Sequence, residues 1–202
     1  MGLDDYLNLG VLGALEQINQ VCPGQKVNAV GYCLGGTLLS IAAAKLGRDK
    51  DDRLASITLL AAQTDFSEPG NIGMFIDQAK VGFIESLMRP SGYLDIVKMS
   101  SAFLMIGSAD RKWAQLTKEY ILGERSPPND LMAWNADGTR LSIRMHSQYL
   151  RHMYLNNDLA KGRYRVADKP IHLEDITCPV FAVGTAQDFV APWRSVYRSR
   201  CR

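Results

Sequence analysis

Long hydrophobic runs are missing from this sequence, and no uninterrupted apolar stretch approaches the roughly 18 residues that a membrane-spanning helix requires. The first residues include Asp4 and Asp5, whereas a secretion signal would begin with basic residues. Tyr6 stands where a myristoylation signal would carry Ser or Thr. The sequence therefore predicts a cytoplasmic chain without a transmembrane segment.

An excess of charge of one sign is also lacking, and cysteine is sparse. The 23 Lys and Arg residues nearly balance the 21 Asp and Glu residues and form no basic block, so we expect no nucleic-acid partner. The four cysteines, Cys22, Cys33, Cys178 and Cys201, are scattered and include no Cys-x-x-Cys pair. This spacing predicts reduced thiols and no metal site built on cysteine.

The sequence does contain enough apolar material for a buried core, with 47% hydrophobic residues in a chain of 202. Its most informative stretch spans residues 26–39, where an apolar run leads into a cysteine between glycines and then into a helix-like segment. This order is typical of a nucleophile elbow, a strained turn that exposes a reactive side chain at the end of a parallel strand. Such a turn needs minimal side chains on both sides of the nucleophile, and we expect Gly31 and Gly35 to fill that need around Cys33.

The elbow interpretation predicts the chemistry of Cys33. The helix expected from about residue 36 would begin beneath the thiol, and the positive end of its dipole would favour the thiolate. The N–H of Leu34 would stabilise the oxyanion formed when Cys33 attacks a carbonyl carbon. Two alternatives are a buried structural cysteine and a phosphate-binding loop. The second lacks a Gly-x-Gly-x-x-Gly pattern and a Gly-Lys-Ser/Thr ending.

Periodic segments around the elbow predict an α/β fold. Residues 4–19 repeat apolar side chains every three or four positions, as an amphipathic helix does, and residues 54–62 form a second apolar strand. A strand, a helix and a strand in this order predict a parallel sheet with helices on its faces. We expect no clear strand between residues 71 and 168, and a short buried strand returns at residues 177–184. Helix-like spacing between them occurs at residues 73–88, 94–106, 113–122 and 143–159.

These segments predict an incomplete α/β-hydrolase-type parallel sheet core with an inserted helical cap. Residues 1–70 would form the first part of the core with the elbow, residues 71–168 the cap, and residues 169–202 the return to the core with the strand that carries the acid. Several cap aromatics are candidates for lining a substrate channel, although ordinary packing is the simpler expectation for most of them: Phe83, Tyr93, Trp113, Trp134 and Tyr149.

Asp188 is the candidate acid of a catalytic triad. It follows the strand at residues 177–184, and a carboxylate there lies at the sheet edge that holds the nucleophile. The order of nucleophile and then acid matches the α/β-hydrolase order, which requires a histidine after the acid. The chain stops at Arg202 without one, so we expect it to be a fragment. All three histidines precede Asp188 and are expected to be ordinary surface or packing residues: His146, His152 and His172.

Six blocks along nearly the whole chain resemble the polyhydroxyalkanoate synthases, also called poly(3-hydroxyalkanoate) polymerases, in a class I-like form. The blocks lie at residues 4–12, 31–37, 65–67, 134–140, 145–147 and 191–197. Together they are far more specific than the elbow alone. One departure is Phe189, which stands where the family usually has a histidine directly after the acid.

The resemblance implies a cytoplasmic acyltransferase that takes 3-hydroxyacyl groups from coenzyme A, lengthens a polyester chain and sits on the granule surface. It carries Cys33 over as the nucleophile and Asp188 as the acid. It also implies a homodimer when the protein is complete, with coenzyme A leaving as a product and no resident cofactor or metal.

Two alternatives to an active synthase remain. A dienelactone-hydrolase-like enzyme has a similar elbow, but such enzymes resemble a minimal core without a large cap. A non-catalytic, granule-associated remnant of a synthase is compatible with the missing histidine.

Overall fold

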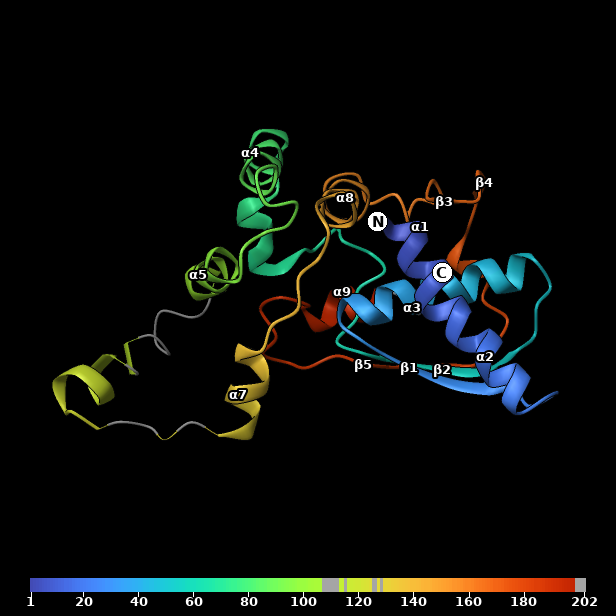
Figure 1. Cartoon of the computed structure of the whole chain (residues 1–202), viewed down its shortest axis with the longest axis horizontal. Coiled ribbons are helices and arrows are strands. Elements are labelled where there is room, and N and C mark those ends of the chain that lie inside the picture. Colours follow the sequence, from blue (N-terminus) through green and yellow to red (C-terminus); the bar gives the residue numbers. More distant parts are fainter. Residues whose placement is uncertain (107–112, 115, 125–126, 128, 199–202) are drawn as a thin grey trace.

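A three-stranded parallel sheet forms the core of the computed structural model, which describes residues 1–106, 113–114, 116–124, 127 and 129–198 (Figure 1). Its strands are β1 (Val27–Tyr32), β2 (Leu54–Leu60) and β5 (Val180–Val183), in the order β1-β2-β5. Both pairs are parallel, as the sequence predicts, so the carboxyl ends of all three strands lie at one edge of the sheet. That edge carries the candidate site.

Helices cover one face of this sheet. A continuous helical segment runs through α1 (Leu3–Asp5), the π-helical η1 (Tyr6–Leu12) and α2 (Gly13–Val21), and it confirms the helix predicted at residues 4–19. The elbow helix α3 (Leu34–Arg48) lies beside it (Figure 1). Strand side chains that point to this face are buried or half-buried against the two helices. The shared cluster contains Leu15, Leu39, Ala43, Leu46, Leu54, Ile57, Leu59 and Ala62.

The opposite face of the sheet carries several large apolar side chains and is uncovered by any helix in the described part of the chain (Figure 1). Val30, Thr58 and Phe181 are in register across the three strands on this face. Val30, Tyr32 and Phe181 are 67%, 66% and 64% exposed, values unusual for large apolar side chains of a parallel sheet. The sequence predicts helices on both faces, whereas the structure shows them on one.

The segment between β2 and β5 is mainly helical, as predicted for the inserted cap. Its helices are η2 (Gly70–Phe75), α4 (Gln78–Met88), α5 (Ile96–Ile106), η3 (Thr117–Ile121), α7 (Asp130–Ala136), α8 (Ile143–Gln148) and η4 (Tyr149–Leu155). Helix α7 was not expected. A short hairpin of β3 (Arg165–Val166) and β4 (Lys169–Pro170) was also not expected, because no clear strand was predicted between residues 71 and 168. Ala167 and Asp168 form its tight turn, and both adopt positive φ angles. The remaining elements are η5 (Leu173–Asp175) and α9 (Trp193–Arg198).

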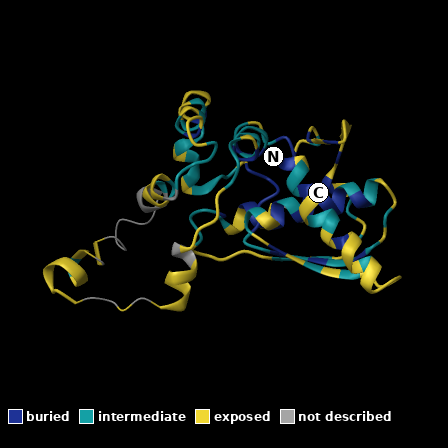
Figure 2. Ribbon diagram, in the orientation of Figure 1, coloured by how far each residue is buried: buried dark blue, intermediate teal, exposed yellow. Residues whose placement is uncertain are grey.

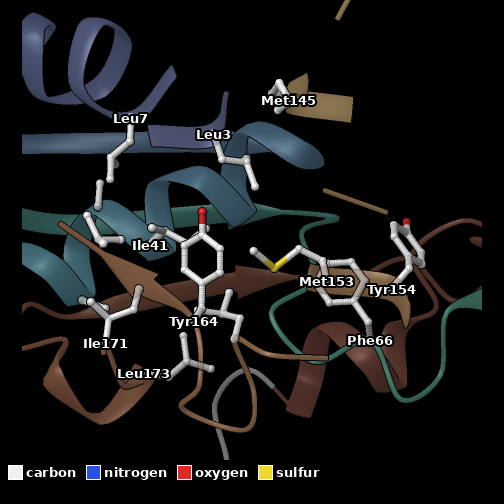
Figure 3. Close-up of a cluster of buried hydrophobic side chains, with 14 of the residues drawn as sticks. Leu3, Leu7, Ile41, Phe66, Met145, Met153, Tyr154, Tyr164, Ile171 and Leu173 are labelled. Carbon is white, nitrogen blue, oxygen red and sulfur yellow. The ribbon is translucent and has the colours of Figure 1, made fainter. Parts of the chain in front are cut away.

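The insertion has an exposed outer part, which runs from α4 to α7, and a buried last part, which begins at α8. Three aromatics of its outer part, Phe83, Trp113 and Trp134, are 63% to 68% exposed, and Figure 2 shows that most of this part is surface. Its last part instead packs into the main core, where Met153 and Tyr164 meet side chains from the amino-terminal helices and α3 (Figure 3). The domain boundaries at residues 70 and 168 stay a prediction.

An ion pair joins two helices of the insertion. Glu85 on α4 accepts hydrogen bonds of 2.6 and 2.7 Å from the Arg151 guanidinium on η4, and it also accepts a bond from the Ser147 hydroxyl. These donors lower the pKa of Glu85 to about 2. The pair holds η4, which carries two residues of the candidate site, against α4.

Candidate active site

Cys33 sits in a strained turn between β1 and α3. Its backbone angles are φ 51° and ψ −123°, a conformation that a residue with a side chain rarely adopts. Its N–H donates to the Leu60 carbonyl of the neighbouring strand at 2.9 Å, and its carbonyl accepts from the N–H groups of Gly36 and Thr37. The strand, cysteine and helix predicted from residues 26–39 are therefore present, and the strained residue is the proposed nucleophile.

The glycines that permit this turn are not the pair expected from the sequence. A Cβ on Gly31 would lie 2.5 Å from the Cα of Gly36, and a Cβ on Gly36 would lie 2.4 Å from the Cβ of Ala62. A Cβ on Gly35 would meet nothing within 4 Å. The expectation for Gly35 is wrong because α3 begins at Leu34, so its first turn presses Gly36 against the strand and points Gly35 away from it.

Alanine substitutions at the two neighbouring glycines should have opposite effects on stability. We expect Gly36→Ala to lower the free energy of unfolding by about 1–3 kcal/mol, because the new methyl group overlaps Ala62 and the Gly31 carbonyl. Gly35→Ala, the matched control, should be neutral or stabilising by up to about 1 kcal/mol, because alanine favours the helix. Urea unfolding of both variants measures the difference, and equal losses would remove the steric explanation.

The thiol of Cys33 is harder to ionise than the elbow motif alone predicts. Burial raises the pKa of Cys33, the N–H of Leu34 lowers it by hydrogen bonding, and the negative charge of Asp188 raises it again, with a net increase. The expectation of a favoured thiolate is therefore wrong for this chain, because desolvation outweighs the hydrogen bond from the Leu34 N–H. The N–H of Leu34 points toward the sulfur, and its role as an oxyanion donor stays a prediction.

Asp188 lies close enough to Cys33 for its charge to act on the thiol. Its Oδ1 accepts hydrogen bonds from the N–H groups of Val190 and Ala191 at 2.8 and 2.9 Å, and these bonds fix the loop after β5. The start of the insertion supports this loop, because Asn71 donates its N–H to the Phe189 carbonyl at 2.8 Å. The structure thus brings together the two residues predicted as nucleophile and acid.

The three histidines have other surroundings, and none shares a hydrogen bond or ion pair with Cys33 or Asp188 in the described part of the chain. His146 is buried on α8, where burial lowers its pKa and its Nδ1 has no partner. The Nδ1 of His152 lies 2.9 Å from Asp158. The side chain of His172 lies against Gly162. The expectation that they are ordinary packing or surface residues agrees with these positions.

Two tyrosines lie beside Cys33, of which Tyr149 was among the cap aromatics considered for a substrate channel and Tyr154 was not predicted as a site residue. Tyr149 and Tyr154 lie on η4 with ring centroids 5.4 Å apart, and the rings are nearly perpendicular. On a regular α-helix, residues five apart point about 140° away from each other. The π-helical backbone of η4 instead brings them to one side. The α-helical periodicity of the sequence therefore does not predict their pairing.

Comparison with known proteins agrees with this geometry. The family model described as the alpha/beta hydrolase fold matches residues 3–201, and the chain belongs to that family. A hydrolase from Oleispira antarctica supports the fold, with a TM-score of 0.51 at 15% identity over 98% of this chain and 59% of its own.

Relatives at higher identity are named as polymerases. The chain is 38% identical over 192 residues to the poly(3-hydroxyalkanoate) polymerase subunit PhaC of Rhizobium etli, covering 95% of this chain and 30% of that protein. It is 35% identical to the poly(3-hydroxyalkanoate) polymerase of Methylorubrum extorquens, over 98% of this chain and 33% of that protein. The resemblance predicted from the motifs is thus confirmed, and the chain spans about a third of the length of these curated relatives.

The described residues offer neither a membrane-spanning helix nor a metal site. Of the helices in the described residues, none is both long and apolar enough to cross a membrane. The same residues contain no group of three His, Cys, Asp or Glu side chains arranged to hold a metal ion.

Proposed function

We propose that this chain is the nucleophile-bearing part of a poly(3-hydroxyalkanoate) polymerase, an acyltransferase that joins 3-hydroxyacyl groups from coenzyme A into a polyester. The observation that carries the proposal is the strained turn that places Cys33 beside Asp188 in a chain similar to these polymerases. The similarity supports the substrate class, and the geometry supports a cysteine nucleophile.

The chemistry suits a thiol. The Cys33 sulfur forms a bond to the thioester carbon, the carbon–sulfur bond to coenzyme A breaks, and the leaving thiolate takes up a proton. One thioester replaces another at nearly equal free energy, so the acyl-enzyme retains the free energy that favours acyl transfer to a hydroxyl group. The hydroxyl of a second unit then attacks the same carbon and Cys33 leaves as thiolate, while a general base takes the hydroxyl proton.

That base is proposed to be a histidine oriented by Asp188. None of the three histidines present occupies this position, and burial together with the charge of Asp188 leaves the pKa of Cys33 raised. The chain alone is therefore proposed to be a poor catalyst. Neither a metal nor a redox cofactor takes part in the proposed cycle.

The partners are part of the same proposal. They are a 3-hydroxyacyl-CoA substrate, the growing polyester and the granule surface, in the cytoplasm and in a homodimer of the complete protein. A second candidate function is a granule-bound polymerase remnant without turnover, which is favoured by the absence of a histidine beside Asp188 in the described residues.

A chimera distinguishes the active polymerase from the granule-bound remnant without turnover. This chain would replace the matching segment of the Rhizobium etli polymerase, whose other segments would supply the remaining parts of the enzyme. We expect the chimera to release coenzyme A from 3-hydroxybutyryl-CoA and form polymer, whereas the chain alone stays at background because a general base is typically worth about 10²- to 10⁴-fold in rate. Granule binding by a chimera that never turns over would support the remnant instead.

A further inference from the structure

Four side chains from three separate parts of the fold form a hydrogen-bonded network beside Cys33. Tyr149 and Tyr154 lie on η4, Thr37 lies on the elbow helix α3, and Gln63 follows β2 and is almost fully buried. The Thr37 hydroxyl donates to the main-chain carbonyl of Gln63 at 2.7 Å, and the Tyr154 hydroxyl lies 3.4 Å from its Oε1. The Tyr149 hydroxyl is within hydrogen-bonding reach of those of Tyr154 and Thr37.

Groups that can only accept fix the direction of these bonds. The Nε2 of Gln63 lies 3.4 Å from the Glu68 carbonyl and 3.0 Å from the Ser195 Oγ. Since a carbonyl cannot donate, this end of the Gln63 side chain is the NH₂ group. The Ser195 hydroxyl gives its own proton to the Asp65 carbonyl, so it accepts from Gln63. The oxygen of the Gln63 amide therefore faces Tyr154, and the Tyr154 hydroxyl is the donor.

Tyr149 and its two hydroxyl neighbours then have more lone pairs than protons. Thr37 donates its hydroxyl proton to the main-chain carbonyl of Gln63, and Tyr154 donates its own to the Gln63 Oε1. Tyr149 has one proton and two neighbours that could take it, the oxygens of Thr37 and Tyr154. After that single bond forms, one of these neighbours and the Tyr149 oxygen itself retain unfilled lone pairs. These lone pairs can accept a hydrogen bond from a group that binds here.

This acceptor surplus belongs to the site of Cys33 and Asp188. Burial raises the pKa of Tyr154, and the charges of an ionised Cys33 and of Asp188 raise it further. Burial likewise raises the pKa of Tyr149 well above its ordinary value, with a further contribution from an ionised Cys33. Both phenols therefore stay protonated and neutral during turnover, which suits binding rather than proton transfer.

We propose that Tyr149 and Tyr154 form a subsite that accepts a hydrogen bond from the hydroxyl group of the acyl substrate. The inference rests on the proposed function and adds the residues that distinguish a 3-hydroxyacyl group from the same group without its hydroxyl. Tyr149 contacts the substrate, and Gln63 is a positioning residue that fixes which way the Tyr154 hydroxyl points.

The test measures protection of Cys33 from iodoacetamide in the chimera with the Rhizobium etli polymerase, with Cys178 as an internal reference. The probes are amide analogues of 3-hydroxybutyryl-CoA and butyryl-CoA, in which nitrogen replaces the thioester sulfur so that no acyl transfer consumes the thiol. We expect half-protection at about a tenfold lower concentration of the hydroxy analogue, since one hydrogen bond of ordinary strength corresponds to that ratio. Tyr149→Phe and Tyr154→Phe should each reduce the ratio to below about twofold.

Tyr164→Phe is the matched control, because Tyr164 is a buried tyrosine that lies well apart from Tyr154 (Figure 3). It should keep the wild-type ratio. Equal protection of the unsubstituted chimera by both analogues overturns the subsite and leaves the acyl-CoA proposal intact. A failure of both analogues to protect overturns the proposed function together with the subsite. A tenfold ratio that survives both tyrosine substitutions shows that another group binds the hydroxyl.

Discussion

Replacing Cys33 by alanine in the chimera with the Rhizobium etli polymerase is expected to reduce coenzyme A release to background, a loss of at least about 10⁴-fold. The acyl group would have no atom on which to be held, and loss of a nucleophile in enzymes of this mechanistic type costs up to about 10⁶-fold in turnover. Cys33 is the cysteine that adopts the strained positive φ angle of the elbow, whereas Cys178 precedes β5 and does not.

Cys178→Ala is the matched control for this prediction. Cys178 is also half-buried and has a pKa raised by burial, so it resembles Cys33 in surroundings but not in backbone geometry. The Cys178 variant should keep turnover within about twofold of the unmodified chimera. A steady-state assay of thiol release compares the two, and comparable activity in both variants would remove Cys33 from the mechanism.

The second large effect is expected at Asp188. Asp188→Asn should lower turnover of the chimera by about 10⁴-fold, because the histidine would lose the carboxylate that orients it. The substitution leaves the loop intact, since the amide oxygen of Asn can still accept from Val190 and Ala191. Asp52→Asn, at a fully exposed carboxylate paired with Lys26, is the control that should change turnover little.

The same substitution should have the opposite effect on the thiol in the 202-residue chain. Asp188 raises the pKa of Cys33 through its negative charge, so its neutral replacement lowers that pKa. Alkylation of Cys33 near neutral pH should therefore become faster in Asp188→Asn while catalysis by the chimera falls. Slower alkylation in the variant would show that Asp188 does not face Cys33 as described.

The parts of this structure that could be predicted from the sequence are those set by local pattern. The apolar run before Cys33, the helix after it and the parallel strand at residues 54–62 are present, and Asp188 lies beside the thiol. Each follows from side-chain periodicity and from the fixed order of a parallel sheet. The helical insertion could be predicted for the same reason.

What could not be predicted depends on contacts between distant segments. The need for glycine at position 36 arises from Ala62, which belongs to the loop after another strand. The pairing of Tyr149 with Tyr154 depends on a π-helical backbone that no periodicity in the sequence marks. The raised pKa of Cys33 reflects burial and the charge of Asp188, neither of which a motif reports.

The most direct measurement is the site of the acyl-enzyme. The chimera would be mixed with 3-hydroxybutyryl-CoA, quenched in acid within one turnover, digested and analysed by mass spectrometry. The account predicts a 3-hydroxybutyryl adduct on the peptide that contains Cys33, removable by hydroxylamine as a thioester is, and no adduct on the peptide with Cys178. Turnover with an unmodified Cys33, or with the acyl group on another residue, would contradict the assignment of Cys33 as the nucleophile.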